Sequence, residues 1–303
     1  MTGPSAGVRS EPVCITCQDG YRLAGDLWLP DAAPCAAVII NPATGVRAGY
    51  YHRYARFLAE AGLASLTYDY RGIGGSRPAR LRGSGITWRN WGERDFEATV
   101  TFMEQGFNGS PLLVVGHSIG GFLPGFAPGA ARLARILTVG AQFAYWPDYL
   151  ASRRPALVLK WHVLMPALTV ACGYFPGQRL GWLEDLPAGV ALEWGFRRAR
   201  FERSYLARDR AAILARFAAV QAPILAVRVA DDEFGTARAI RRALSPYTGS
   251  ERTEVRLRPR DLGFACIGHF GLFHDRHRDG FWRASLAWLR EGINPWPGAV
   301  EAC

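Results

Sequence analysis

One ten-residue stretch, Leu112–Gly121 (LLVVGHSIGG), constrains the fold most, because an apolar run passes directly into a serine flanked by glycines. The run Leu112–Val115 is typical of a strand buried on both faces, as in parallel sheets covered by helices. Ser118 follows in a Gly-x-Ser-x-Gly turn, where Gly116 and Gly120 allow backbone segments to approach closely. This pattern predicts a strained turn that presents a nucleophilic hydroxyl, provided that the chain also supplies a base, an acid and an oxyanion hole.

The rest of the chain predicts an alternation of strands and helices. Strands are expected at 13–17, 23–29, 36–40, 63–70, 112–115, 135–139, 224–229 and 253–257. Helices are expected around 51–61, 91–105, 237–245 and 280–290. This order predicts an α/β fold in which helices flank a mostly parallel sheet.

The segment between Val139 and Ile224 breaks this alternation, and a structureless connection of that length is not credible in a compact domain. The sequence therefore predicts a core at 10–140 and 222–295, interrupted by an inserted, mainly helical cap at 141–221. The insertion is rich in tryptophan: Trp146, Trp161, Trp182 and Trp194. Aromatic walls predict an apolar pocket that favours acyl or aromatic substrates over ionic ones.

Two late loops offer the partners that a serine nucleophile needs. In this architecture the acid and then the histidine follow the nucleophile along the chain. The strand at 224–229 runs into three acidic residues, of which Asp232 has the spacing expected for the orienting acid, with Asp231 and Glu233 as alternatives. His269 lies on the loop after the strand at 253–257 and is the predicted base.

The other five histidines fit that role less well. They lie inside the serine turn, at a helix start, in the insertion, or among charged residues typical of a solvated face: His117, His52, His162, His274 and His277, in that order.

Acyl transfer also needs hydrogen-bond donors for the oxyanion. The amide N–H of Ile119, directly after the serine, is one predicted donor. The second is expected from the loop after the strand at 36–40, where we expect the N–H of Ala43, with Thr44 as the alternative. Substrate contacts are further expected at Thr44, Tyr145, Trp146 and Phe270.

Composition excludes several other functions. The net charge of +10 comes almost entirely from arginines interleaved with acidic residues, so no nucleic-acid footprint is expected. Cys14 and Cys17 have metal-ligand spacing, but no second pair follows, and neither a metal nor any other cofactor is predicted. The apolar stretch at 156–175 contains Lys160, His162 and Pro166, which favour a lid over stable membrane insertion. Free thiols and a start without a secretory signal predict a cytoplasmic protein, and no feature predicts an oligomeric state.

Taken with these residues, the chain resembles the α/β-hydrolases, and within them the branch of serine aminopeptidases and monoacylglycerol lipases that carries a helical cap. The resemblance rests on NPATG, YDYRGIGGS, GHSIGG, DDEFG and GHFG in that order, over about residues 12–145 and 220–290. It implies a Ser-His-Asp triad and an anchoring, structural role for Asp69. The oxyanion loop departs from the His-Gly form of this branch in having Asn41-Pro42.

These observations predict a serine hydrolase that cleaves a carboxylic ester of a small molecule through an acyl-enzyme on Ser118. One alternative is an aminopeptidase or amidase, in which acidic residues of the insertion such as Glu184, Asp185 or Glu193 bind the substrate amine. Another is an acyltransferase or lyase with the same triad. Dehalogenase and epoxide-hydrolase chemistry is excluded, because both need an aspartate at the position of Ser118.

Overall fold

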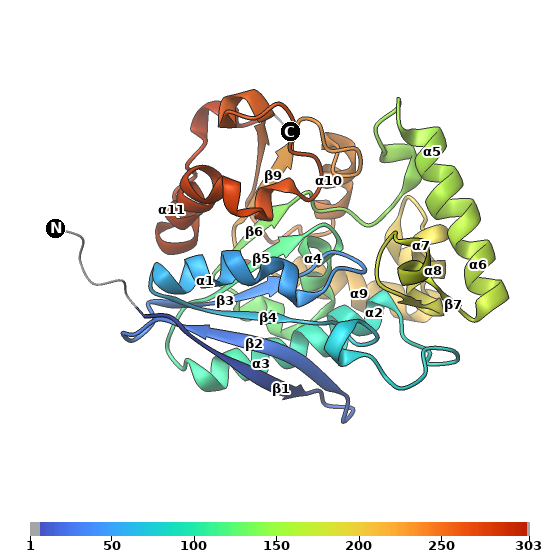
Figure 1. The fold of residues 1–303 in the computed structure, drawn as a ribbon, viewed down its shortest axis with the longest axis horizontal. Helices are drawn as coiled ribbons and strands as arrows, with labels where there is room; N and C mark the ends of the chain where they lie inside the picture. The colour runs from blue at the N-terminus through green and yellow to red at the C-terminus, as the bar shows by residue number, and fades with distance from the viewer. Residues whose placement is uncertain (1–6, 302–303) are drawn as a thin grey trace.

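A mixed eight-stranded sheet runs through the centre of the computed structural model, which describes residues 7–301 (Figure 1). In spatial order its strands are β1 (Arg9–Thr16), β2 (Arg22–Leu29), β4 (Leu63–Tyr68), β3 (Ala36–Asn41), β5 (Leu112–His117), β6 (Arg135–Val139), β9 (Ile224–Val229) and β10 (Arg252–Leu257). The pairs β1–β2 and β2–β4 are antiparallel and all later pairs are parallel. This confirms the predicted mostly parallel sheet, although β1 begins at Arg9 rather than at residue 13.

Helices cover both faces of the sheet because alternate strand residues point to opposite sides. In β5, Leu113 and Val115 join the core layer of α1 (His52–Glu60) and α11 (Arg283–Glu291). Val114 joins the opposite layer. That layer includes α3 (Glu97–Gly106), α9 (Ala207–Ala219) and α10 (Ala237–Leu244). The continuous apolar strands of the sequence are therefore buried on both sides.

The helix expected at 91–105 begins three residues earlier than predicted. It starts with α2 (Trp88–Asn90), passes through a π-helical segment (Trp91–Phe96) and continues as α3. Thr87 caps it: the Asn90 N–H donates to Thr87 Oγ1 at 3.3 Å, and the Thr87 N–H donates to Asn90 Oδ1 at 2.9 Å. This reciprocal capping box explains why helical structure begins at Trp88.

The insertion between β6 and β9 is mainly helical, as predicted. It contains α5 (Arg154–Val158), a π-helical segment (Leu159–Leu164), α6 (Met165–Cys172), α7 (Gly177–Leu180), α8 (Ala188–Gly195) and α9. Two very short strands, β7 (Tyr174–Phe175) and β8 (Leu186–Pro187), pair antiparallel within it. Figure 1 shows α5 to α8 grouped at one side of the molecule, whereas Phe217 of α9 packs on Phe122 directly behind the serine turn.

The apolar stretch of the insertion forms one continuous helix, Arg154–Cys172. Within residues 7–301 it is the one helix that is long and apolar enough, by length and composition alone, to cross a membrane, and 28% of its most apolar 18-residue window is buried. Leu157, Trp161 and Met165 are buried against the rest of the chain. Its outward face carries Leu159 and Val170 at 54% and 73% exposure, so this face is apolar without a covering element among the described residues.

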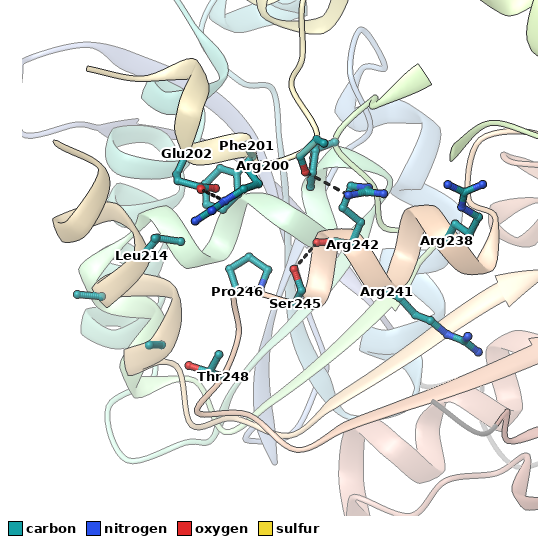
Figure 2. A pocket seen from close by; sticks show the side chains of 14 residues that line it. Arg200, Phe201, Glu202, Leu214, Arg238, Arg241, Arg242, Ser245, Pro246 and Thr248 are labelled. Atoms are coloured by element: carbon teal, nitrogen blue, oxygen red, sulfur yellow. Dashed lines mark hydrogen bonds and ion pairs between the residues drawn. The ribbon is translucent and has the colours of Figure 1, made fainter. Parts of the chain in front are cut away.

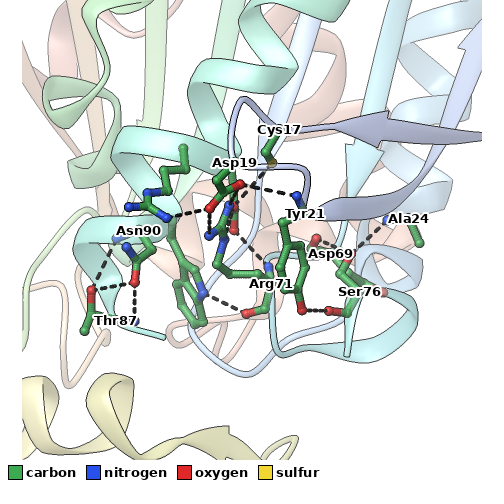
Figure 3. Close-up of polar contacts among 12 residues, drawn as sticks. Cys17, Asp19, Tyr21, Ala24, Asp69, Arg71, Ser76, Thr87 and Asn90 are labelled. Atoms are coloured by element: carbon green, nitrogen blue, oxygen red, sulfur yellow. Dashed lines mark hydrogen bonds and ion pairs between the residues drawn. The ribbon is translucent and has the colours of Figure 1, made fainter. Parts of the chain in front are cut away.

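A buried ion cluster fixes the YDYRGIGGS turn (Figure 3). Arg71, whose side chain is 4% exposed, donates from Nε to Asp95 Oδ1 at 2.5 Å and from Nη1 to Asp19 Oδ2 at 2.8 Å. Arg94 also binds Asp19, but its side chain is 50% exposed. The Asp69 carboxylate accepts the amides of Ala48 at 2.7 Å and Gly75 at 2.8 Å, which agrees with an anchoring role.

Replacing Arg71 with methionine is expected to destabilise the fold by about 3–5 kcal/mol, because Asp95 is then left charged or protonated in a buried site without its partner. Arg94→Met is the matched control: it removes another guanidinium from the same Asp19 but at the surface, and should cost below about 1 kcal/mol. Urea unfolding of both variants measures the difference. Equal losses would contradict the assignment of the buried pair as the anchor of this turn.

Candidate active site

The turn between β5 and α4 (Ile119–Phe122) places Ser118 in a strained backbone conformation. Its φ of 56° is unusual for a residue with a side chain. The turn is also tightly packed, because a Cβ at Gly116 would lie 2.5 Å from Gly120 O, and one at Gly120 would lie 2.4 Å from Asn41 O. The predicted need for glycine at both positions is therefore a matter of space.

His269 and Asp232 come together from two loops at the carboxyl end of the sheet. His269 Nδ1 lies 2.7 Å from Asp232 Oδ2, and both side chains are buried. Asp232 Oδ1 accepts the amides of Phe234 and Gly235, each at 2.8 Å. Burial alone raises the pKa of Asp232, but His269 and these two amides outweigh burial and hold the pKa below its usual range. An ionised Asp232 only accepts, so Nδ1 carries the proton and His269 Nε2 is left as an acceptor.

The two alternative acids have other partners. Asp231 accepts the amides of Ile267 at 2.9 Å and Gly268 at 3.1 Å, so it braces the loop that carries His269 without contacting the imidazole. Glu233 forms an ion pair with Arg153 at 3.1 Å. Among the three adjacent acids, the structure brings Asp232 to the histidine.

His117, next to the serine, links the two loops. Its Nε2 lies 2.9 Å from the carbonyl oxygen of His269, and its Nδ1 lies 2.7 Å from Tyr51 Oη. Since a carbonyl only accepts, Nε2 carries the proton and Nδ1 accepts from Tyr51. Burial, with His269 as a second cause, lowers the pKa of His117 to about 3, so its ring is neutral at ordinary pH.

The Ala43 amide is not free, contrary to the expectation that it donates to an oxyanion. Tyr51 Oη gives its proton to His117, and it accepts the Ala43 N–H at 2.9 Å. The Thr44 N–H has no acceptor among residues 7–301, and the Ile119 N–H lies at the open start of α4. Asn41 ties this loop to the turn by donating from Nδ2 to Gly120 O at 3.2 Å.

Gln142 is a residue that the sequence analysis missed. Its Nε2 donates to Ser118 Oγ at 3.0 Å. Its Oε1 accepts the N–H of Ala144, which fixes the orientation of the amide. Ala144 has a φ of 63°, so a second strained residue serves this contact. The sequence feature that could have identified Gln142 is a polar residue shortly after β6. Since β6 is the parallel neighbour of β5, the two strands end at the same edge of the sheet, and residues that follow them lie close together.

Ser118 and His269 open into one cavity of about 200 Å³. The core side of the cavity includes two of the predicted substrate contacts, Thr44 and Phe270, and Gln142 adjoins them from the first residues after β6. The insertion supplies most of the opposite side: Leu157, Lys160, Trp161, Trp182, Leu183 and Trp194. An aromatic site beside the serine agrees with the aromatic composition of the insertion.

Tyr145 and Trp146, also expected to contact substrate, lie outside this cavity. The Tyr145 ring packs against the Arg242 guanidinium, 4.7 Å from its centroid, and Trp146 is 43% exposed. Asp148 binds Arg242 of α10, and this ion pair fixes the segment that carries Tyr145 and Trp146 against α10 rather than beside the serine. Spacing along the chain did not reveal this contact.

A larger cavity of about 790 Å³ lies between α9 and α10 and contains neither Ser118 nor His269 (Figure 2). Its arginines have carboxylate partners: Arg200 binds Glu202 at 2.7 Å, and Arg241 binds Glu254 at 2.8 Å. Size alone therefore does not identify the reactive site.

Two remaining sequence inferences concern histidine and cysteine. His277, expected on a solvated face, is 1% exposed and packs on Phe264 at 4.3 Å between ring centroids. Cys14 is exposed and Cys17 buried, as expected for residues on opposite faces of a strand. No group of three or more His, Cys, Asp and Glu side chains within residues 7–301 is arranged to hold a metal ion.

Comparison with known proteins agrees with the fold described above. The sequence model of the serine aminopeptidase family S33 matches residues 32–258. Human monoglyceride lipase is 27% identical over 149 residues, which are 46% of this chain and 48% of that protein. The match thus spans about half the length of this curated relative.

Solved structures show the same fold at low identity. A hypothetical protein of Pseudomonas aeruginosa superposes with a TM-score of 0.60 at 16% identity, covering 96% of this chain and 94% of the other. An esterase of Pyrococcus furiosus gives 0.58 at 15% identity, covering 95% and 92%. Est1E of Butyrivibrio proteoclasticus, with ferulic acid bound, gives 0.59 at 17% identity, covering 92% and 98%. All three likenesses support the α/β-hydrolase fold.

The buried His117 predicts a loss of stability in acid. Its pKa is about 3 in the folded chain and about 6.5 when unfolded, so the unfolded state binds more protons between these values. The contribution of His117 to the free energy of unfolding is therefore fully present above about pH 6.5. It decreases as the pH is lowered towards 3. Between pH 7 and 4.5, His117→Gln should lose about 2 kcal/mol less than the parent chain in urea unfolding. Parallel losses in the two proteins would show that His117 does not titrate this way.

Proposed function

Because this chain belongs to the serine aminopeptidase family S33, we propose that it is a serine hydrolase that cleaves a carboxylic ester of an apolar acyl or aromatic small molecule. The chain is an α/β-hydrolase, and its relatives include a lipase and an esterase. The observation that carries the proposal is the 2.7 Å contact between His269 and Asp232 in a cavity that also contains Ser118.

In the proposed first step, His269 Nε2 takes the proton of the Ser118 hydroxyl while Oγ attacks the ester carbonyl. Gln142 donates to Ser118 Oγ, which leaves the hydroxyl proton free for the histidine. Asp232 holds the imidazole in the tautomer that accepts this proton and stabilises the imidazolium that forms.

The tetrahedral intermediate places a negative charge on the former carbonyl oxygen. We assign the Ile119 N–H and the Thr44 N–H as its donors, since Tyr51 already accepts the Ala43 amide. The intermediate collapses when His269 returns the proton to the leaving alcohol. A water molecule, deprotonated by His269, then attacks the acyl-enzyme and releases the acid.

The insertion at 141–221 serves as a cap in this proposal. Its Trp161, Trp182 and Trp194 lie across the cavity from Ser118 and exclude water from the reacting bond. The volume of about 200 Å³ is below the roughly 300–1,000 Å³ of pockets that hold drug-sized ligands, which favours short acyl chains or a single ring.

The aminopeptidase alternative has less support. The acidic residues that could bind a substrate amine are already paired: Glu184 with Arg47 at 2.8 Å, Asp185 with Arg77 at 2.8 Å, and Glu193 with Arg197 at 3.5 Å. None of these three carboxylates lines the cavity.

A fluorophosphonate probe tests the nucleophile. We expect stoichiometric labelling of Ser118, with no labelling of Ser118→Ala. 4-Nitrophenyl esters should be hydrolysed fastest when the acyl chain is short, with rates falling beyond about eight carbons, and faster than aminoacyl anilides. Absence of labelling would refute every nucleophilic mechanism, labelling without ester turnover would indicate transfer or lyase chemistry, and faster anilide cleavage would indicate a peptidase.

The adjacent aspartates provide a matched pair of variants for the acid. Asp232→Asn should lower kcat by about 10³–10⁴, because an amide at Oδ2 reverses the hydrogen bond and favours the wrong imidazole tautomer. Asp231→Asn keeps an acceptor for one of the two loop amides, does not touch the imidazole, and should lower kcat by less than about tenfold. Steady-state kinetics on one 4-nitrophenyl ester compares them, and similar losses would reject Asp232 as the orienting acid.

A further inference from the structure

Gln142 makes two hydrogen bonds to Ser118. Its backbone N–H donates to Ser118 O at 3.4 Å, and its side-chain Nε2 donates to Ser118 Oγ at 3.0 Å. No other group within residues 7–301 hydrogen-bonds this Oγ. Gln142 is 6% exposed, so little water competes for its donor. The oxygen of the free serine is therefore held by a buried amide.

The segment after β6 keeps this amide in place. The Ser118 N–H donates at 2.9 Å to the O of Val139, the last residue of β6, so the serine turn and this segment are joined through their backbones. Oε1 of Gln142 accepts the N–H of Ala144, which has a strained φ of 63°. Such strain persists only where surrounding contacts over-determine it. The position of the Gln142 amide is therefore built into the fold.

The strength of the bond from Gln142 depends on what Ser118 Oγ carries. An amide nitrogen only donates, so Oγ is the acceptor. A hydroxyl or alkoxide oxygen accepts well, whereas the bridging oxygen of an ester accepts poorly, because its lone pair is delocalised into the carbonyl. The donor thus stabilises the free serine, and the transition state in which Oγ leaves, more than it stabilises the acyl-enzyme.

We propose that Gln142 is a catalytic residue of deacylation, which stabilises Ser118 Oγ as the acyl group leaves it. The inference rests on the proposed hydrolysis through an acyl-enzyme. After water has added, the oxyanion re-forms the carbonyl, the C–Oγ bond breaks and its electron pair passes to Oγ. The His269 imidazolium gives Oγ the proton that it took from water, and the Gln142 Nε2–H stabilises the charge that develops on the same oxygen.

Deacylation needs this donor more than acylation does. In acylation the group expelled is the alcohol or phenol of the substrate, and Gln142 bonds Ser118 Oγ rather than that oxygen. In deacylation the group expelled is the serine alkoxide, which is a poor leaving group. Since hydrogen bonds to a charged oxygen are stronger than those to a neutral one, the donor acts mainly on this second step.

The test measures the two steps separately at pH 8 with 4-nitrophenyl hexanoate. The rate of the pre-steady-state burst of 4-nitrophenolate gives the rate constant of acylation. Dividing kcat by the fraction of chain that carries a hexanoyl group during saturated turnover gives that of deacylation, and intact mass after acid quenching measures this fraction. The ratio of deacylation to acylation is the readout, because a general loss of order in the site slows both steps.

Two substitutions separate the donor from the loop contact. Gln142→Glu keeps the shape and an acceptor for the Ala144 N–H, but its ionised carboxylate cannot donate to Oγ; Gln142→Met loses both contacts. We expect the ratio to fall at least about tenfold in both variants. Gln105→Met is the control, because Gln105 is exposed on α3 and does not line the cavity, and it should keep the parent ratio. An unchanged ratio in Gln142→Glu, or equal slowing of both steps, would reject the assignment.

Hydroxylamine separates this inference from the proposed hydrolysis. It attacks the hexanoyl group in place of water, forms the hydroxamic acid and expels the same Oγ. If the Ser118 adduct resists water, but hydroxylamine releases it about tenfold more slowly in Gln142→Glu than in the parent chain, the hydrolase proposal fails and the role of Gln142 stands. If the parent chain hydrolyses the ester and Gln142→Glu releases the acyl group equally fast to both nucleophiles, the role of Gln142 fails and the esterase proposal stands. Absence of the adduct on Ser118 would overturn both.

Discussion

The close packing of the turn between β5 and α4 is the constraint on which the rest of this structure depends. A side chain at Gly116 or Gly120 would collide with the backbone, and Ser118 accepts a strained φ of 56°. Such strain persists only when surrounding contacts over-determine it. Here Asn41 binds Gly120 O, and α9 packs Phe217 against Phe122. The result is a hydroxyl held at the carboxyl end of a buried strand.

Around this fixed point the chain arranges its polar groups in an ordered series of hydrogen bonds. His117 links Tyr51 to the backbone of His269, so the loop that carries His269 is positioned from the serine turn itself. Asp232 fixes the tautomer of His269. Gln142 approaches the serine oxygen from the loop that follows the neighbouring strand β6. The insertion lines the cavity beside this series with indoles and a single ammonium.

The fold and the placement of the principal candidate residues could be predicted because both depend on backbone position. Apolar strand runs and loop order place Ser118, Asp232 and His269 at one edge of a parallel sheet, and the structure brings Asp232 rather than Asp231 to the histidine. What sequence reasoning missed depends on side-chain direction. The occupied amide of Ala43 requires knowing that Tyr51 folds back onto it.

Contacts made by the insertion could not be predicted either, because they join segments that are far apart in the chain. Trp88 and Trp194 meet from the core and the insertion, and Lys160 lines the cavity from a π-helical segment that has no clear sequence signal. Tyr145 and Trp146 were expected to contact substrate because they lie close in sequence to the end of β6. The ion pair between Asp148 and Arg242 instead holds their segment against α10, outside the cavity.

The most direct test of the account is the identity of the acylated residue. Mixing the protein with 4-nitrophenyl hexanoate, quenching in acid during turnover and measuring the intact mass should show one hexanoyl group per chain, mapped by peptide sequencing to Ser118. Ser118→Ala should show neither the adduct nor ester turnover above background. An acyl group on another residue, or hydrolysis retained in Ser118→Ala, would contradict the account.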